Sequence, residues 1–210
     1  MRGVAPGTAA SPRYVALEGI EGAGKSSIAS GLAERLSADG ERVVRVREPG
    51  GTAAGELIRH ILLDAPAAVA PWTEALLFAA ARAQLAAEVV RPALDAGAFV
   101  ITDRSVYSSL AYQGGGRRLG VDRVRAANQP GLGATWPSLV VLLKIAPEVG
   151  LARQQVADRI GAEGIAFQSA VAAAFDDLAA AEPDTFCIVD ASQELDQVVQ
   201  DVYDVVRRQW

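Results

Sequence analysis

Short apolar runs alternate along the chain with longer stretches in which apolar residues recur three or four positions apart. Continuous apolar runs of about four to eight residues are typical of strands buried on both faces, whereas the longer spacing is typical of helices. We expect strands at residues 14–19, 42–47, 98–103, 138–145 and 185–190. We expect helices at residues 25–38, 54–63, 73–96, 121–128, 147–158, 165–181 and 194–209.

This alternation predicts an α/β fold with a five-stranded parallel sheet and helices on both faces. Ligands of such sheets bind beyond the carboxyl ends of the strands, so the residues that follow each strand are the first candidates for function. Residues 1–12 hold one arginine and no continuous apolar segment, which indicates a flexible tail and neither a secretory signal nor a membrane anchor. We expect residues 13–210 to form a single domain, because no linker interrupts the pattern.

Composition narrows the range of partners. The chain carries 20 Lys and Arg against 25 Asp and Glu and has no dense basic block, so we expect no nucleic-acid partner. Its strongly apolar segments, such as residues 139–143, are far shorter than the roughly 20 residues that span a bilayer, so we expect no membrane partner. The single cysteine, Cys187, fits a buried core position and a cytoplasmic location. The single histidine, His60, has no partner at metal-site or triad spacing and is interpreted as structural.

A phosphate-binding loop follows the first predicted strand, where residues 19–26 read GIEGAGKS. The sequence matches G-x-x-x-x-G-K-[ST], and its place between a strand and a helix is the context that this pattern requires. Backbone N–H groups of such a loop face phosphates, the lysine reaches the β and γ phosphates, and the serine can bind Mg²⁺. The loop predicts a P-loop NTPase fold and leaves open whether the acceptor is water, a small molecule or a protein. The predicted nucleotide-binding residues are Gly19, Glu21, Gly22, Ala23, Gly24, Lys25, Ser26 and Ser27.

Three further stretches, each at a strand end or on a helix that faces the expected crevice, indicate the acceptor. They are REPGGT at residues 47–52, LFAAARAQ at residues 77–84 and DRSVYSSLAYQG at residues 103–114. Together with the phosphate loop, in this order and spacing, they closely resemble the thymidylate kinase family. The resemblance is strong from about residue 14 to residue 117 and looser towards the C-terminus. It implies a nucleoside monophosphate kinase that uses ATP and Mg²⁺ to convert dTMP into dTDP, with ADP as the second product.

The resemblance also implies an acceptor site. Phe78 would stack on the base, and Arg82 would hydrogen-bond the edge of the base. Tyr112 would lie beneath the deoxyribose and disfavour a 2′-hydroxyl. Arg47 would contact the monophosphate, and Pro49 would help to turn the backbone towards it. The further residues expected around the base are Ser108, Ser109 and Gln113. Taken alone, Phe78 would fit a core position and Arg47 a solvated strand end; the accompanying motifs favour the functional reading.

Charged residues are expected beside the transferred phosphoryl group. Asp103 ends an apolar run, where P-loop enzymes place the carboxylate that organises Mg²⁺, so Ser26 and Asp103 are the predicted metal residues. Arg104 would hold the acceptor phosphate and reduce the repulsion between two anions. Glu21 matches an acidic position of the family and is expected to position groups, since phosphoryl transfer needs mainly alignment and charge stabilisation. An isolated Asp-Arg pair would more often be a surface ion pair. Lys25, Glu21 and Arg104 form the predicted catalytic set.

The lid over ATP is expected at about residues 150–163. Members of the family carry the transition-state arginine either in the phosphate loop or in the lid. Because this loop has Ala23 at the relevant place, the lid should supply the arginine, through Arg153 or Arg159. Bacterial relatives of the lid-arginine type continue as DRIE and FxxRVRxxY, whereas this chain reads DRIG and FQSAVAAAF. The lid is therefore divergent, and both arginines could instead occupy a solvated helix face.

Two other functions stay open from the sequence. One is a related enzyme that acts on a different or modified nucleotide. The other is a nucleotide-binding protein with weakened catalysis, although the presence of Lys25, Ser26, Asp103 and Arg104 argues against a complete loss of chemistry. Members of the family are generally homodimers, so the resemblance implies a homodimer here.

Overall fold

The computed structural model describes residues 12–64, 68–153 and 159–210. Within these residues the chain forms a five-stranded sheet in which all neighbouring strands run parallel. The strands are β1 (Tyr14–Glu18), β2 (Val43–Arg47), β3 (Phe99–Asp103), β4 (Leu139–Lys144) and β5 (Phe186–Asp190). All five predicted strands are confirmed, and their order across the sheet is β2-β3-β1-β4-β5.

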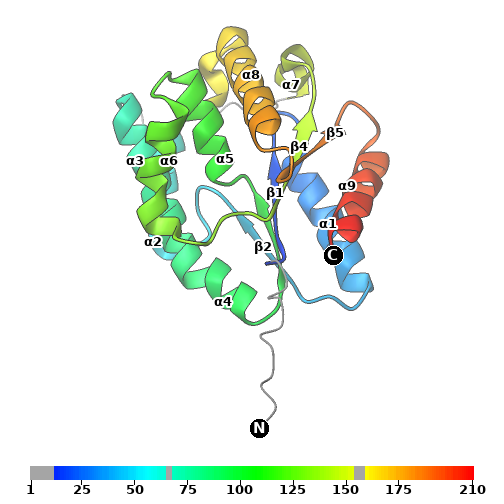
Figure 1. Cartoon of the computed structure of the whole chain (residues 1–210). Coiled ribbons are helices and arrows are strands. Elements are labelled where there is room, and N and C mark those ends of the chain that lie inside the picture. Colours follow the sequence, from blue (N-terminus) through cyan, green and yellow to red (C-terminus); the bar gives the residue numbers. More distant parts are fainter. Residues whose placement is uncertain (1–11, 65–67, 154–158) are drawn as a thin grey trace.

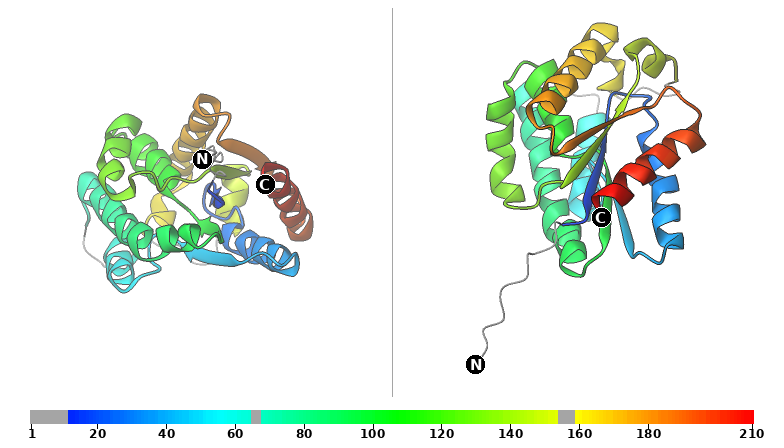
Figure 2. Two further views of the ribbon diagram at one scale, coloured as in Figure 1. Left: turned by 60° about the horizontal axis from the view of Figure 1, so that its bottom comes forward. Right: turned by 45° about the vertical axis from the view of Figure 1, so that its right-hand side comes forward.

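Helices cover both faces of the sheet, as predicted (Figure 1). On one face α1 (Lys25–Ala38) packs against α9 (Leu195–Gln209), and Figure 2 shows the same pairing from two further directions. On the other face α3 (Pro71–Leu85) packs against α6 (Val121–Leu132). The further helical segments are α2 (Ala53–Leu63), η1 (Ala86–Val90), α4 (Arg91–Asp95), α5 (Val106–Ser109), η2 (Leu110–Gly116), α7 (Pro147–Arg153), η3 (Gly161–Glu163) and α8 (Ile165–Ala181).

The longest helical region that was not predicted follows β3. Residues 106–116 form α5 and then the π-helical segment η2, where the sequence analysis expected no helix. The side chain of Ser105 accepts a hydrogen bond from the backbone N–H of Tyr107 at 3.2 Å and so caps the first turn. The apolar side chains of the following turns are buried, including Val106 and Leu110. Capping and burial therefore outweigh the weak helix propensity of this glycine-rich stretch.

Two expectations fall partly outside the described residues. The predicted tail includes residues 1–11, and the predicted lid and the helix that leads into it include residues 154–158. The described part of that helix is α7, which ends at Arg153. No described helix combines the length and the apolar character that a bilayer-spanning segment requires.

The central strand β1 positions the functional residues. Every residue of β1 is buried between β3 and β4, and Leu17 of β1 lies in register with Asp103 of β3. The loop after β1 therefore meets the residues that follow β3 at the carboxyl edge of the sheet. The edge strand β5 is less covered, so Cys187 is half-buried and not fully buried as expected.

Candidate active site

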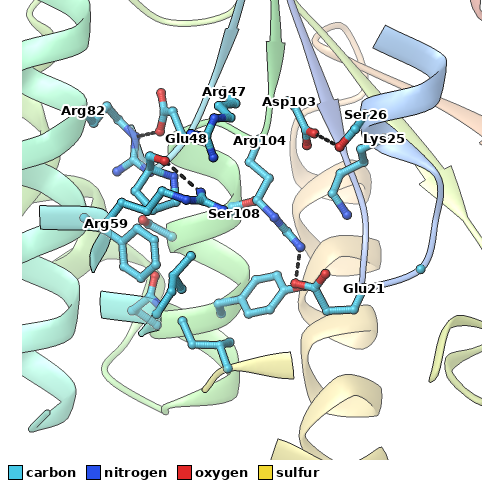
Figure 3. A pocket seen from close by; sticks show the side chains of 18 of the residues that line it. Glu21, Lys25, Ser26, Arg47, Glu48, Arg59, Arg82, Asp103, Arg104 and Ser108 are labelled. Atoms are coloured by element: carbon cyan, nitrogen blue, oxygen red, sulfur yellow. Dashed lines mark hydrogen bonds and ion pairs between the residues drawn. The ribbon is translucent and has the colours of Figure 1, made fainter. Parts of the chain in front are cut away.

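A cavity of about 410 Å³ lies beyond the carboxyl ends of β1, β2 and β3 (Figure 3). It brings together residues that are far apart in the sequence, and most of the predicted site residues line it. These are Glu21, Gly22, Gly24, Lys25, Ser26, Ser27, Arg47, Pro49, Phe78, Arg82, Asp103, Arg104, Ser108, Ser109, Tyr112 and Gln113. Gly19 and Ala23 belong to the phosphate loop but are buried and do not line the cavity.

The backbone of the phosphate loop has a shape that only glycine adopts easily. Gly22 and Gly24 have φ angles of +74° and +85°, and Gly24 forms the N-cap of α1. The loop also touches the main chain of α7. A Cβ atom on Gly22 would lie 2.1 Å from the carbonyl oxygen of Gly150, and a Cβ atom on Gly150 would lie 2.4 Å from the carbonyl oxygen of Glu21. The glycines thus allow two backbones to approach each other directly.

Lys25 is the first residue of α1, and its side chain folds back over the loop. Its Nζ donates to the carbonyl oxygens of Gly19 at 3.1 Å and of Ile20 at 2.8 Å. Burial and the nearby charge of Arg104 lower the pKa of Lys25 to about 8. The ammonium group is therefore held at the loop by weak neutral acceptors, and an anionic phosphate would be a better partner.

Two side chains with oxygen atoms that could bind a divalent cation lie beside the lysine. The hydroxyl of Ser26 donates a hydrogen bond to Oδ2 of Asp103, as Figure 3 shows. A hydroxyl and a carboxylate are hard ligands of the kind that Mg²⁺ accepts together with water and phosphate oxygens. The described residues contain no cluster of three or more His, Cys, Asp or Glu side chains that could hold a metal. A cation at Ser26 and Asp103 would therefore also depend on ligands from the nucleotide.

Arg104 points across the cavity from the end of β3. Its guanidinium donates to Glu21 Oε1 and, at 3.2 Å, to Ser108 Oγ, and it lies 5.0 Å from the ring centroid of Tyr112. The Arg104 charge lowers the pKa of Glu21 below its ordinary value, although burial opposes the shift. Arg104 also has a φ angle of +70°, which is uncommon outside glycine. Such local strain is often found at functional sites.

Arg82 is fixed by acceptors from three parts of the chain. It is 3% exposed, and its Nε donates to Glu48 Oε2 at 2.6 Å. Its Nη1 donates to Asn128 Oδ1, and its Nη2 donates to the carbonyl oxygen of Ser105 at 3.0 Å. A guanidinium has five N–H bonds, so these three contacts leave two further donors on a residue that lines the cavity. The orientation of those two donors is set by the protein before any ligand binds.

Glu18 lies beneath the acceptor side of the cavity and was missed by the sequence analysis. Its Oε1 accepts hydrogen bonds from the backbone N–H of Ser105 at 2.7 Å, the Ser105 hydroxyl at 2.7 Å and the backbone N–H of Ser108 at 3.0 Å. Its Oε2 accepts from the Ser108 hydroxyl at 2.6 Å. Burial raises the pKa of Glu18, although these serines and Arg104 oppose the shift. An acidic residue that ends a buried strand was the available signal for this role.

Other cavity residues were also missed. Glu48, Arg59, Leu63 and Ile160 line the cavity without belonging to the predicted set. Arg59 comes from α2 and donates from Nη1 to the carbonyl oxygen of Pro49 at 2.9 Å. Its position two turns into the helix after REPGGT carried no local signal that separated it from a solvated arginine. Arg59 adds a further cation to the side of the cavity formed by α2.

The two predicted lid arginines do not line the cavity. Arg153 donates from Nη1 to the carbonyl oxygen of Ala191 at 3.0 Å. Arg159 donates from Nη2 to Glu74 Oε2 at 2.6 Å and from Nε to the carbonyl oxygen of Leu62 at 2.8 Å. Backbone carbonyls and a buried carboxylate thus hold both guanidinium groups in this structure. A catalytic role for either arginine stays a prediction.

Known proteins are similar in sequence to this chain over most of its length. A family model described as thymidylate kinase matches residues 17–202. A thymidylate kinase of Pseudomonas fluorescens (strain SBW25) is 48% identical over 192 residues, which cover 89% of this chain and 91% of the relative. A thymidylate kinase of Bifidobacterium longum (strain DJO10A) is 46% identical over 190 residues, which cover 88% and 92%. One of Synechococcus sp. (strain JA-3-3Ab) is 42% identical over 194 residues, which cover 92% and 95%. With the parallel sheet and its phosphate loop, these matches confirm the predicted P-loop NTPase fold, and the chain belongs to the thymidylate kinase family.

Proposed function

We propose that the protein transfers the γ-phosphoryl group of ATP to dTMP and so produces dTDP and ADP. The observation that carries this proposal is the shared cavity, in which the phosphate loop faces Phe78 and the fixed guanidinium of Arg82. A phosphate-binding end and a base-binding end therefore lie within one site. The relatives of similar sequence are named thymidylate kinases, which supports the same substrate.

The donor side of the cavity would hold the triphosphate. Backbone N–H groups of the loop and the start of α1 would face the phosphates, and the Lys25 ammonium at the loop would add a positive charge. Ser26 and Asp103 would hold Mg²⁺, which would supply positive charge beside the phosphates during transfer. Arg104, held by Glu21 and Ser108, would orient the acceptor phosphate against the repulsion of the donor.

The acceptor side would recognise the nucleoside. Phe78 offers a face for stacking, and the two remaining N–H donors of Arg82 can bind a carbonyl on the edge of a base. Tyr112 is buried at the other wall, where its ring packs against Phe167 and Phe175 and cannot move aside easily. A fixed ring at this place would leave little room for a 2′-hydroxyl, which favours a deoxyribonucleotide.

The first test measures ADP release with MgATP against a panel of nucleoside monophosphates. We expect the highest kcat/KM with dTMP and a loss of at least about a hundredfold in Lys25→Ala, because the charge on the β and γ phosphates loses its partner. Lys144→Ala is the matched control, since Lys144 is exposed and pairs with Asp176 away from the cavity. ATP binding without turnover of dTMP would contradict the proposal and favour a different acceptor or a binding protein.

Arg153 and Arg159 can be tested in the same assay. An arginine aimed at the transferring group contributes about 10³–10⁵ to the rate in P-loop enzymes. If either residue supplies that charge, its replacement by alanine should lower kcat by a comparable factor and leave the KM for dTMP unchanged. A small change in kcat would indicate that the guanidinium makes only its contacts with backbone carbonyls and Glu74 and does not act on the transferred group.

We further propose a homodimer that forms through α2 and α3. Leu57 and Ile61 of α2 are 72% and 45% exposed, and Leu76 of α3 is 55% exposed, on two helices that pack together. Leu57 and Ile61 are four positions apart and so share one face of α2. We expect a dimer in sedimentation experiments, a monomer for Leu57→Glu, and an unchanged dimer for Leu195→Glu, whose side chain is exposed on α9. A cytoplasmic location stays a prediction from the single cysteine.

A further inference from the structure

The side-chain amide of Gln113 has a fixed orientation. Gln113 lines the cavity from η2 and is 2% exposed, and its Nε2 donates to Glu74 Oε1 at 2.9 Å. An amide can often be turned over without a visible change in shape, but an ionised carboxylate only accepts hydrogen bonds. The nitrogen of Gln113 must therefore face Glu74. None of the described residues donates to Gln113 Oε1, so this oxygen is left for a ligand.

Hydrogen bonds from neighbouring side chains hold the Glu74 carboxylate in place and favour its ionised form. It is 1% exposed in the first turn of α3, and it accepts hydrogen bonds from Arg117 Nε at 3.2 Å and from Arg159 Nη2 at 2.6 Å. Burial alone would raise the pKa of Glu74, but the hydrogen bonds from Gln113, Arg117 and Arg159 lower it below its ordinary value. The two arginines also balance the buried charge. Arg117 is shared with a second carboxylate, that of Glu163.

We propose that Glu74 is a positioning residue for acceptor recognition, which holds the Gln113 amide so that its oxygen faces the base. The inference rests on the proposed function and deepens it. The cavity then offers N–H donors from Arg82 and an acceptor from Gln113. Thymine and uracil carry a carbonyl beside a ring N–H and complement this pair. Cytosine carries an amino group beside an unprotonated ring nitrogen and would place donor against donor and acceptor against acceptor.

The test compares dTMP with dCMP in Glu74→Gln. The new side chain has nearly the same shape but can donate as well as accept, so the Gln113 amide is free to turn over. We expect the ratio of kcat/KM for dTMP to kcat/KM for dCMP to fall at least about tenfold, because unpaired polar groups in the site carry the discrimination. The KM for ATP should stay within about twofold, which a general loss of structure would not allow.

Glu163→Gln is the matched control. It removes the other carboxylate partner of Arg117 and leaves the contact between Glu74 and Gln113 in place. Its ratio of kcat/KM values should equal that of the wild type. A wild type that does not phosphorylate dTMP would overturn the proposed function. An active wild type with an unchanged ratio in folded Glu74→Gln would overturn only the role of Glu74.

A measurement on the wild type covers the case in which Glu74→Gln does not fold. The side-chain amide signal of Gln113 can be assigned by NMR from its loss in Gln113→Leu. With saturating dTMP, we expect the two amide protons to stay protected from solvent exchange with little change in chemical shift, because they still face Glu74. A large shift that shows donation to the base would overturn the inference.

Discussion

Lys25 provides a pH-dependent test of nucleotide binding. Burial and the charge of Arg104 lower its pKa to about 8 in the free protein. Phosphate groups favour the charged ammonium, so nucleotide binding should raise this pKa and take up a proton. Affinity for MgATP is then greatest below the Lys25 pKa of the free protein, and it falls as the pH rises from that value towards the higher pKa of the complex.

The size of the effect follows from that pKa. A group with a pKa of about 8 is about nine-tenths charged at a pH of about 7 and about one-tenth charged at a pH of about 9. If only the charged form of Lys25 binds the phosphates, the affinity for MgATP should fall about tenfold between these two conditions. This corresponds to about 1.4 kcal/mol of binding free energy.

Isothermal titration calorimetry measures both the affinity for MgATP and the proton uptake on binding. Titrations of MgATP in buffers with different ionisation enthalpies give the affinity and the number of protons taken up at each pH. Lys25→Arg is the control, because a guanidinium stays charged throughout this range and its affinity should not change with pH. A wild-type affinity that is constant up to a pH of about 9 would refute the reasoning. If the affinity of Lys25→Arg falls with pH as steeply as that of the wild type, the titrating group is not Lys25.

Two further predictions concern the loop and the strand that support the site. Glu18→Met should lower the free energy of unfolding in urea by about 3 kcal/mol or more, because four hydrogen-bond donors lose their acceptor. Glu18→Gln keeps an acceptor oxygen and should cost about 1 kcal/mol or less. Equal effects of the two substitutions would show that the donors find other partners. Gly22→Ala should abolish MgATP binding, because its Cβ would lie 2.1 Å from the Gly150 oxygen. Gly40 has a similar φ of +86° but no atom within 4 Å of the position that a Cβ would take, so Gly40→Ala should lower the free energy of unfolding by about 1 kcal/mol and keep MgATP binding. If both variants bind MgATP normally, the close approach of Gly22 to Gly150 is not required for binding.

The sequence predicted the fold because its signals are local. The strands β1, β3 and β4 are short apolar runs that are buried where the alternation predicts them, whereas the edge strands β2 and β5 are only partly buried. Residues 106–116 were different, since three glycines, a tyrosine pair and β-branched Val106 give no helical periodicity. Their helix depends on the Ser105 cap, which directly precedes the segment, and on packing against α6 and α8, which is not local to it.

The same limit applies to the site. Residues within recognisable motifs, such as Lys25 and Arg104, were found because glycine spacing and strand ends mark them. Glu74 was missed, since its partner Gln113 is 39 positions away and no pattern joins them. Arg159 was assigned to the phosphates from its place in the lid, but the buried charge of Glu74 holds it in this structure. Partners that meet only through the fold cannot be read from one sequence.

The contact between Gly22 and Gly150 has a consequence for the inference of contacts from related sequences. The two positions are 128 residues apart in the sequence, and neither has a side chain that could report on the other. Methods that infer contacts from correlated substitutions need pairs that vary together, and a side chain at either position would meet main chain that cannot be substituted away. This contact between the phosphate loop and α7 should therefore be invisible in such correlations.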